Sequence, residues 1–486
     1  MINVRLIFKV LGSLLFVEST LFLWSLIISF IYGEDDVFAF LISIVLTMFV
    51  GFVFRFIGRK ADNNLGRRDA YLVVTLAWTL FSAFGCLPFL ISGFGDISVT
   101  DAFFEMMSGF TTTGATIFDK VEILPHGLMF WRTSTQWIGG LGIAFFTLAL
   151  LPSLTGGNTK VFSAEATGPI KTKLHPRLSS SARTIWLVYV ILTIACLLCY
   201  NIAGMNLFDS LNYAMTSTAT GGFSTHSDST EYFNSPAMDY ITTVFCFLSS
   251  VNFTLLYMAV VRREPYRLFR SSEFRFFCSM VLICTAFIMS VLVINKNYGI
   301  EHAFRSALFQ VVSFISTTGL FNDNAAQWPH VTWVVLAVCM FVGGMAGSTS
   351  GGFKCIRANM VAKITRNEFK RILHPSAVLP IKIDGTNIPM DKRVTLFAFF
   401  SIYVIMILVS AFIMIAAGVD NTNAITIALS SMGNVGPTLG TEIGPTMSWA
   451  ELPTFAKWMC SFLMLVGRLE IFTVLVIFTP GFWKKV

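Results

Sequence analysis

Four segments of the sequence share a glycine that follows hydroxyl-bearing or other small residues, and such a pattern could bind a cation. The segments read FEMMSGFTTTGAT, LNYAMTSTATGGF, FQVVSFISTTGLF and TIALSSMGNVGPT. Aligned without gaps, they place Gly114, Gly221, Gly319 and Gly436 at one position. Glycine reaches backbone angles that are barred to other residues, so carbonyl oxygens at such a turn can point toward a common axis. A ring of backbone carbonyls can replace the hydration shell of a potassium-sized cation.

The candidate ion-binding residues are this glycine and the two residues before it in each segment. They are Thr112, Thr113 and Gly114; Ala219, Thr220 and Gly221; Thr317, Thr318 and Gly319; and Asn434, Val435 and Gly436. An acid lies near the start of each segment, at Asp101, Asp209, Glu301 and Asp420. Negative charge suits the positive N-terminus of a helix and also attracts cations. One such loop is an ordinary turn, but four at matched positions favour a shared site.

Membrane-spanning helices must position these segments. Of the 486 residues, 55% are apolar and 13% are charged, whereas soluble domains carry about 25% charged residues. Ten apolar runs have roughly the length that a spanning helix needs. They are 7–32, 37–57, 71–93, 128–152, 184–204, 237–261, 275–295, 331–353, 393–419 and 453–479. The composition excludes soluble enzymes, nucleic-acid-binding proteins and disulfide-framed secreted domains.

The charges predict the orientation of these spans. An even number of spans leaves both termini on one side, and that side holds 28 of the 34 Lys and Arg but 8 of the 27 Asp and Glu. Loops rich in Lys and Arg face the cytoplasm. We therefore expect both termini to be cytoplasmic. The basic linkers on this side also suit lipid headgroups.

Each glycine segment is too short to span a membrane and lies between two full spans. Non-helical backbone at membrane depth is tolerated where it lines a wet cavity or is buried in protein. We predict an all-α polytopic membrane protein with two N-terminal spans and four span–pore-loop–span repeats around a pseudo-fourfold pore. The expected boundaries are 1–70 for the two accessory spans and 71–183, 184–274, 275–392 and 393–486 for the repeats.

The eighth span contains a glycine-rich stretch that predicts a break. Its candidate gating residues are Gly343, Gly344, Gly347, Ser348, Thr349, Ser350, Gly351 and Gly352. Each glycine costs up to about 1 kcal/mol relative to alanine in a helix. Close packing of helices through small residues is the alternative interpretation. The spacing of Gly347 and Gly352 approximates that of a phosphate-binding loop, but Phe353 stands where that motif has its lysine.

Arg468 lies in the middle of the last span, where a charge is expensive and by default functional. Facing a cavity below the glycine loops, Arg468 would raise the barrier for cations. A buried ion pair with an acid such as Glu470 is the structural alternative.

The repeated unit and its motifs TTTGAT, TATGGF, STTGLF and GNVGPT resemble the Trk/Ktr/HKT superfamily of potassium transporters, and within it the TrkH-type pore-forming subunits of bacteria. The resemblance covers essentially the whole chain. It implies potassium uptake across the inner membrane, with K⁺ as the transported ion and no organic cofactor. It also implies one filter glycine per repeat, a movable intramembrane loop, homodimers and a cytosolic nucleotide-binding ring of the TrkA type.

One departure from the potassium-channel motif and two rival interpretations remain. None of the four loops has the second glycine of the potassium-channel motif TVGYG, which predicts weaker discrimination against Na⁺. A cation-coupled secondary transporter with broken helices is the first rival. A membrane-embedded enzyme is the second, but it would need clustered His, Asp or Cys within the spans, which hold almost none.

Overall fold

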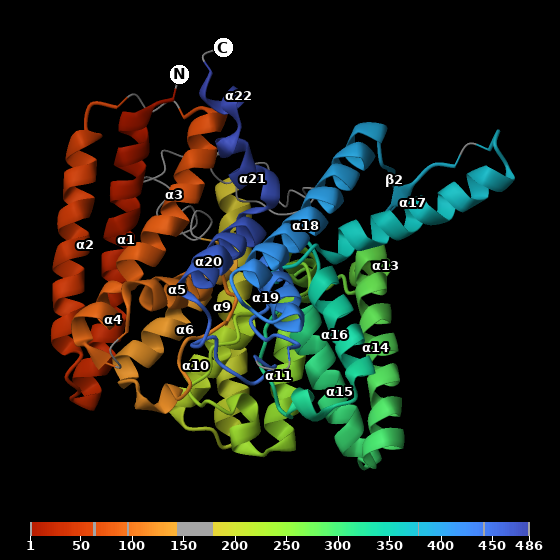
Figure 1. Ribbon diagram of the computed structural model, residues 1–486, viewed down its shortest axis with the longest axis horizontal. Coiled ribbons are helices and arrows are strands. Elements are labelled where there is room, and N and C mark those ends of the chain that lie inside the picture. Colours follow the sequence, from red (N-terminus) through yellow and green to blue (C-terminus); the bar gives the residue numbers. More distant parts are fainter. Residues whose placement is uncertain are drawn as a thin grey trace.

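The computed structural model describes residues 2–61, 65–94, 97–142, 178–377, 379–440 and 443–484. Helices make up most of this part of the chain, and the described chain begins and ends at the same end of the molecule (Figure 1). The last part of the predicted fourth span, 143–152, and the basic residues between 160 and 177 lie outside the described residues.

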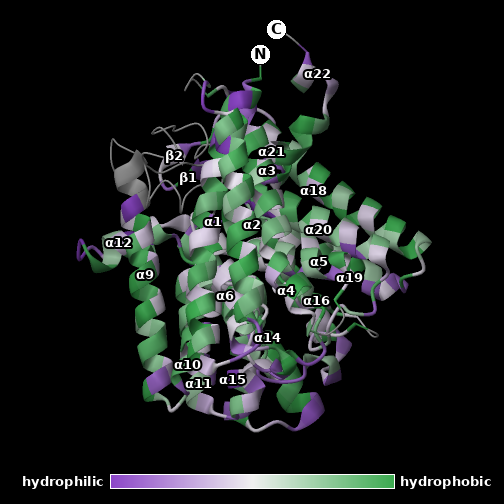
Figure 2. Ribbon diagram, turned by 90° about the vertical axis from the view of Figure 1, so that its left-hand side faces the viewer, coloured by the Kyte–Doolittle hydropathy of each residue, from purple (hydrophilic) through white to green (hydrophobic). Residues whose placement is uncertain are grey.

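Helices α1 (Val4–Tyr32) and α2 (Val37–Ile57) form an antiparallel hairpin at one edge of the molecule (Figure 1). They pack closely because Gly12 and Gly51 face each other, and a β-carbon at Gly12 would lie 2.6 Å from the Gly51 carbonyl oxygen. The outer face of α2 is apolar, with Phe38 76% and Phe49 64% exposed. Figure 2 shows that hydrophobic residues predominate along α1, α2 and the neighbouring long helices. Such a surface suits lipid rather than water.

Among the described residues, six helices are long and apolar enough to cross a membrane, and two bent pairs bring the total to as many as eight. The six are Val4–Tyr32, Val37–Ile57, Arg67–Ser92, Arg183–Ile202, Ser272–Lys296 and Met390–Ala416. The first two are α1 and α2, and the third comprises α3 (Arg67–Gly85) and α4 (Leu87–Ser92). The others are α9 (Leu178–Ile202), α14 (Ser272–Lys296) and α18 (Met390–Ala416).

Four short helices follow the last four of these long ones, where the sequence predicts half-length segments. They are α5 (Val99–Phe110), α10 (Leu207–Ala219), α15 (Ile300–Ile315) and α19 (Asn421–Gly433). Their lengths of 12 to 16 residues, at about 1.5 Å per residue, reach part of the way through a bilayer. Side chains cap the starts of three of them: Ser98 on α5, Asn206 on α10 and Asp420 on α19.

After each short helix the chain returns through a second apolar helix. These are α6 (His126–Leu141), α11 (Pro236–Ser249) with α12 (Phe253–Val260), α16 (His330–Val342), and α20 (Thr454–Leu469) with α21 (Ile471–Leu475) and η5 (Val476–Phe478). The chain bends by 106° between α11 and α12 and by 114° between α20 and α21. The predicted spans at 237–261 and 453–479 therefore each contain a sharp bend.

The bends have local causes. Asn252 caps α12, because its side chain accepts hydrogen bonds from the amides of Thr254 and Leu255. Glu470 stands between α20 and α21 in a left-handed conformation, with φ of 65°. Helix α16 ends at Val342 and the chain becomes helical again at Cys355, so the eighth span breaks at the predicted glycine-rich stretch.

Helix α17 (Cys355–Leu373) and a short hairpin project from the body of the molecule (Figure 1). The hairpin pairs β1 (Lys382–Ile383) with β2 (Thr386–Asn387) in antiparallel register. Short helical turns complete the described chain: η2 (Val121–Ile123), η3 (Ser229–Phe233), α13 (Tyr266–Arg270), η4 (Ala325–Gln327) and α22 (Pro480–Trp483).

Candidate functional site

The four short helices end in turns with one shared backbone conformation. In each turn a residue other than glycine adopts positive φ, and a glycine with positive φ follows two residues later. The pairs are Thr112 and Gly114, Thr220 and Gly222, Thr317 and Gly319, and Asn434 and Gly436. The amide of the residue between them donates to a carbonyl five residues earlier, from Thr113 to Ser108, Gly221 to Thr216, Thr318 to Ser313 and Val435 to Ser430. These bonds define equivalent positions in the four turns.

The second turn departs from the ungapped alignment by one residue. The glycine equivalent to Gly114 is Gly222, with φ of 90°, rather than Gly221. The three equivalent residues are consequently Thr220, Gly221 and Gly222, and Ala219 is the last residue of α10. The two adjacent glycines gave the alignment no means of choosing between them.

The four turns contact one another in a closed cycle. A β-carbon at each positive-φ glycine would overlap a carbonyl oxygen of the next turn. The contacts run from Gly114 to Gly221, from Gly222 to Thr318, from Gly319 to Val435 and from Gly436 to Thr113. The last contact returns to the first turn, so the chain's four glycine loops meet around one centre. Glycine is required here both by φ and by the close approach of another backbone.

Asn434 departs from the threonine of the other turns and has its own contacts. Its side-chain nitrogen donates to the Thr113 hydroxyl at 3.1 Å and to the Met464 carbonyl at 2.9 Å. The amide therefore connects the fourth turn to the first turn and to α20.

The segment from Gly343 to Lys354 contains the residues that the sequence predicts as a gate, and we therefore call it the gating loop. It lies against three of the four turns. Its Gly351 amide donates to the Thr317 hydroxyl at 2.7 Å. The Gly352 amide donates to the Gly433 carbonyl at 2.9 Å, at the end of α19. The Thr349 hydroxyl donates to the Thr218 carbonyl at 3.1 Å, in the last turn of α10. The loop thus covers the C-terminal ends of the short helices.

The gating loop folds back on itself and on the bend between α11 and α12. A β-carbon at Gly343 would lie 2.6 Å from the Gly351 carbonyl, and one at Gly344 would overlap Ser350. The Ser348 hydroxyl donates to the Met345 carbonyl within the loop. The Gly347 carbonyl accepts from the Phe253 amide at 3.0 Å, at the start of α12. All eight candidate gating residues of this stretch lie in this compact, largely buried loop.

Arg468 lies on α20 and reaches the gating loop. Its guanidinium donates to the Thr349 carbonyl at 2.8 Å and to the carbonyls of Gly139 and Gly140, each at 2.6 Å. Glu470 instead forms an ion pair with Arg357 of α17 at 2.7 Å. Arg468 therefore connects α6 to the gating loop.

The acids at the starts of the short helices lie where the sequence predicts them, but several have basic partners. Asp101 pairs with Lys457 at 2.6 Å, and Glu301 pairs with Arg305 at 3.1 Å. Asp209 lies 3.2 Å from His226. Their attraction for free cations is accordingly weaker than four unpaired carboxylates would give.

Sequence reasoning missed a buried ion pair beside the first turn. Arg132 lies on α6 and is 1% exposed. Its Nε donates to Glu105 of α5 at 2.7 Å, and its guanidinium lies 4.3 Å from the Phe223 ring centre. Glu105 also accepts from the amide of Ile117 at 2.9 Å. The loss of either charge would leave the other buried without its partner.

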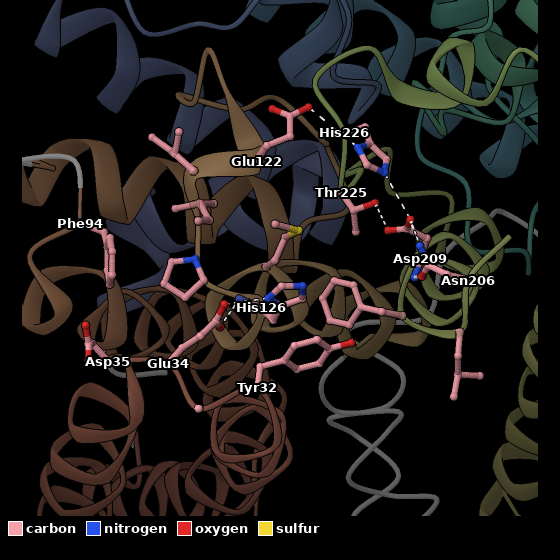
Figure 3. A pocket seen from close by; sticks show the side chains of 17 residues that line it. Tyr32, Glu34, Asp35, Phe94, Glu122, His126, Asn206, Asp209, Thr225 and His226 are labelled. Atoms are coloured by element: carbon pink, nitrogen blue, oxygen red, sulfur yellow. Dashed lines mark hydrogen bonds and ion pairs between the residues drawn. The ribbon is translucent and has the colours of Figure 1, made fainter.

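A cavity of about 750 Å³ opens between the turn that joins α1 to α2 and the N-terminal ends of α6 and α10. Figure 3 shows His226 between Glu122 and Asp209, and His126 beside Glu34. Burial raises the pKa of Glu122, but the hydrogen bonds from Ser227 and the nearby His226 together outweigh burial, so the pKa lies below its usual value. Within the described residues, no group of three His, Cys, Asp or Glu side chains could hold a metal ion.

Apolar helices that surround a set of inward-meeting loops are typical of integral membrane proteins that transport ions. Comparison with known proteins identifies the class more closely. A family model described as TrkH, cation transport protein, matches residues 36–485. The chain therefore belongs to the TrkH family of cation transport proteins.

The relatives extend over the full chain. The Trk system potassium uptake protein TrkH of Halomonas elongata is 37% identical over 99% of this chain and 100% of its own length. The protein of the same name from Escherichia coli K12 is 37% identical over 99% of both chains. A crystal structure of the potassium transporter TrkH from Vibrio parahaemolyticus matches with a TM-score of 0.90 and 36% identity, over 99% of each chain. These relatives are transport proteins rather than enzymes, and the resemblance drawn from the motifs is confirmed.

Proposed function

We propose that the chain takes up potassium through a filter formed by its four glycine turns. The observation that carries this proposal is the closed cycle of contacts among Gly114, Gly222, Gly319 and Gly436 and the neighbouring carbonyls. Four carbonyls around one centre can replace water around a dehydrated K⁺. The filter residues are then Thr112–Gly114, Thr220–Gly222, Thr317–Gly319 and Asn434–Gly436. The C-terminal ends of four helix dipoles add negative potential at the same place.

The architecture follows from the same cycle. Two accessory helices precede four repeats, with boundaries near residues 70, 183, 274 and 392, arranged around a pseudo-fourfold axis. The support is the recurrence of a long helix, a short helix, a glycine turn and a second apolar helix in four stretches of the chain.

The gating loop closes the path below the filter. Its contacts with Thr218, Thr317 and Gly433 put backbone where a permeating ion would leave the filter. Arg468 holds the loop through the Thr349 carbonyl and adds positive charge that repels cations. Opening requires the loop to leave these partners, and its five glycines permit the change of backbone angles.

Regulation comes from outside the chain. We propose that a cytosolic nucleotide-binding ring of the TrkA type acts on the projecting α17 and its hairpin, and that the chain is a homodimer in the bacterial inner membrane. Two observations support this proposal: the chain belongs to the TrkH family, and α17 is basic, with Lys363, Arg366, Lys370 and Arg371. The excess of Lys and Arg on one side supports cytoplasmic termini.

Rubidium uptake in cells that lack their own potassium transporters tests the proposal. Cells that express the chain should accumulate Rb⁺ and grow at low external K⁺. Gly436→Ala should abolish both, because its β-carbon would meet the Thr113 carbonyl. Gly418→Ala is the matched control, since Gly418 also has positive φ in the same repeat but has no neighbouring atom within 4 Å. Equal uptake in the two variants would contradict the filter assignment.

A further inference from the structure

One carbonyl of the proposed filter differs from its three equivalents, and the difference originates in another repeat. Thr113, Gly221, Thr318 and Val435 occupy the same position in the four turns. Three of these residues carry side chains and one does not. The φ of Gly221 is not positive, so the conformation of the turn does not require glycine there.

The reason for glycine at this position is Gln136. This glutamine lies on α6 of the first repeat and is fully buried. A β-carbon on Gly221 would overlap the Gln136 amide. The glutamine side chain thus fills, from a neighbouring repeat, the space that Thr113, Thr318 and Val435 fill with their own side chains.

Three hydrogen bonds hold the Gln136 amide in one orientation. Its oxygen accepts from the Thr216 hydroxyl at 2.8 Å and from the Phe223 amide at 3.1 Å. Its nitrogen donates to the Gly221 carbonyl at 2.7 Å. The exchange of oxygen and nitrogen would set two donors against each other at Phe223 and two acceptors at Gly221, so the partners determine the orientation.

The bond to Gly221 singles out one filter carbonyl. Within the part of the chain that the structure describes, the carbonyls of Thr113, Thr318 and Val435 receive no side-chain hydrogen bond. We propose that Gln136 is a positioning residue for ion selectivity: it fixes the direction of the Gly221 carbonyl and takes up part of its acceptor capacity. This inference rests on the proposed function of the four turns as a filter.

The consequence concerns discrimination between ions rather than folding alone. A carbonyl fixed by a donor resists the inward movement that a smaller ion such as Na⁺ requires. Without the donor, the Gly221 carbonyl can follow the smaller ion, so the preference for the larger ion decreases. The effect acts through Gly221, because Gln136 itself does not touch the ion.

The test uses the full chain reconstituted in vesicles, with influx of radioactive Rb⁺ and Na⁺ as the readout. Gln136→Met keeps the length of the side chain and removes all three hydrogen bonds. The Rb⁺/Na⁺ influx ratio should fall roughly 5- to 10-fold, as expected for the loss of one buried hydrogen bond. Gln310→Met is the matched control, because Gln310 is also buried and donates to a loop carbonyl, that of Asp323. Its ratio should stay at the wild-type value.

A double variant separates positioning from mere packing. Gly221→Ala alone should lower the ratio, because the new methyl group collides with Gln136. In Gln136→Ala/Gly221→Ala the methyl group has room, but the Gly221 carbonyl lacks its donor. The ratio of this double variant should therefore stay low, near that of Gln136→Met. A return to the wild-type ratio would show that Gln136 acts by packing alone and would overturn the positioning role. Should the double variant not fold, Gln136→Ser with Gly221→Ala provides the same comparison.

The outcomes distinguish this inference from the filter proposal. An unchanged ratio in folded Gln136→Met, with a lowered ratio in Gly222→Ala, would overturn the role of Gln136 and leave the filter standing. Unchanged ratios in Gln136→Met, Gly222→Ala and Gly319→Ser together would overturn both. A lowered ratio in Gln136→Met, with Gln310→Met unchanged, supports the positioning role.

Discussion

Arg357 and Glu470 form an ion pair at 2.7 Å between two elements that follow breaks in the membrane helices. Arg357 lies on α17, immediately after the gating loop, and Glu470 forms the bend between α20 and α21. The Arg357 guanidinium also lies 4.0 Å from the centre of the Phe399 ring of α18. The pair therefore holds the end of the gating loop against α18 and the bend between α20 and α21.

Loss of this pair should favour the open state. Glu470→Gln removes the attraction that holds α17, and basal Rb⁺ uptake without any cytosolic partner should rise several-fold. A hydrogen bond to a charged group contributes about 1.5–3 kcal/mol, which sets the upper end of the increase. The exchange variant Arg357→Glu/Glu470→Arg should bring uptake back toward the wild-type rate. If the effects of Arg357→Glu and Glu470→Arg simply add in the double variant, the ion pair does not hold the gating loop closed.

Arg468 should limit flux through both its hydrogen bonds and its charge. Arg468→Ala removes the bonds to Thr349, Gly139 and Gly140, and Rb⁺ influx into vesicles should increase about 10-fold or more. Arg468→Lys keeps the charge and should show a smaller increase. If Arg468→Ala reduces the amount of folded protein and folded molecules show no greater influx, the residue is structural.

Gly351 should be required for a closed gating loop. Its β-carbon would overlap the Gly433 carbonyl, so Gly351→Ala should push the loop away from α19 and increase leak of both Rb⁺ and Na⁺. Gly299→Ala is a suitable control, because no atom lies within 4 Å of a β-carbon there. A wild-type leak in Gly351→Ala would mean that the loop does not seal the path through this contact.

The Arg132–Glu105 pair should stabilise the fold rather than select ions. Both side chains are buried, so Glu105→Gln leaves a buried arginine without its counter-charge and should destabilise the protein by about 3–5 kcal/mol. Thermal unfolding in detergent measures this loss. Arg132→Met/Glu105→Leu removes both charges and should be less destabilised than Glu105→Gln. The opposite order would show that the ion pair itself is net stabilising.

External acidity should weaken the contact between the first two repeats. Hydrogen bonds from Ser227 outweigh the effect of burial and lower the pKa of Glu122, and bonds from His226 and Thr225 do the same for Asp209. Their stabilising effect is therefore present above the unfolded-state pKa values of about 4, and it is lost as pH falls through the lower folded values. The wild-type melting temperature should fall below about pH 4, and Glu122→Gln should flatten this dependence. Glu451→Gln, at an exposed external position, should not.

The sequence predicted the features that recur and missed those that depend on distant contacts. The four short helices, the acids at their starts and the break at Gly343 were predictable, because each depends on local composition. The bend at Glu470 was not, since no glycine or proline stands there and the conformation accompanies an ion pair with a residue far away in sequence.

The second turn illustrates the limit of pattern reasoning at the site itself. Gly221 and Gly222 are alike in sequence, yet Gly222 meets the Thr318 carbonyl and Gly221 meets Gln136. The contacts of the folded chain with α6 and with the third turn distinguish them. In the same way, the pairing of Asp101 with Lys457 could not be inferred from two residues at opposite ends of the chain.

The most direct test of the central claim is the Rb⁺/Na⁺ influx ratio of purified protein in vesicles, with the four positive-φ glycines changed one at a time. Gly114→Ala, Gly222→Ala, Gly319→Ser and Gly436→Ala should each lower the ratio or abolish influx, since each new side chain meets a carbonyl of the next turn. Gly418→Ala should keep the wild-type ratio. A wild-type ratio and rate in all four variants would contradict the assignment of these turns as the filter.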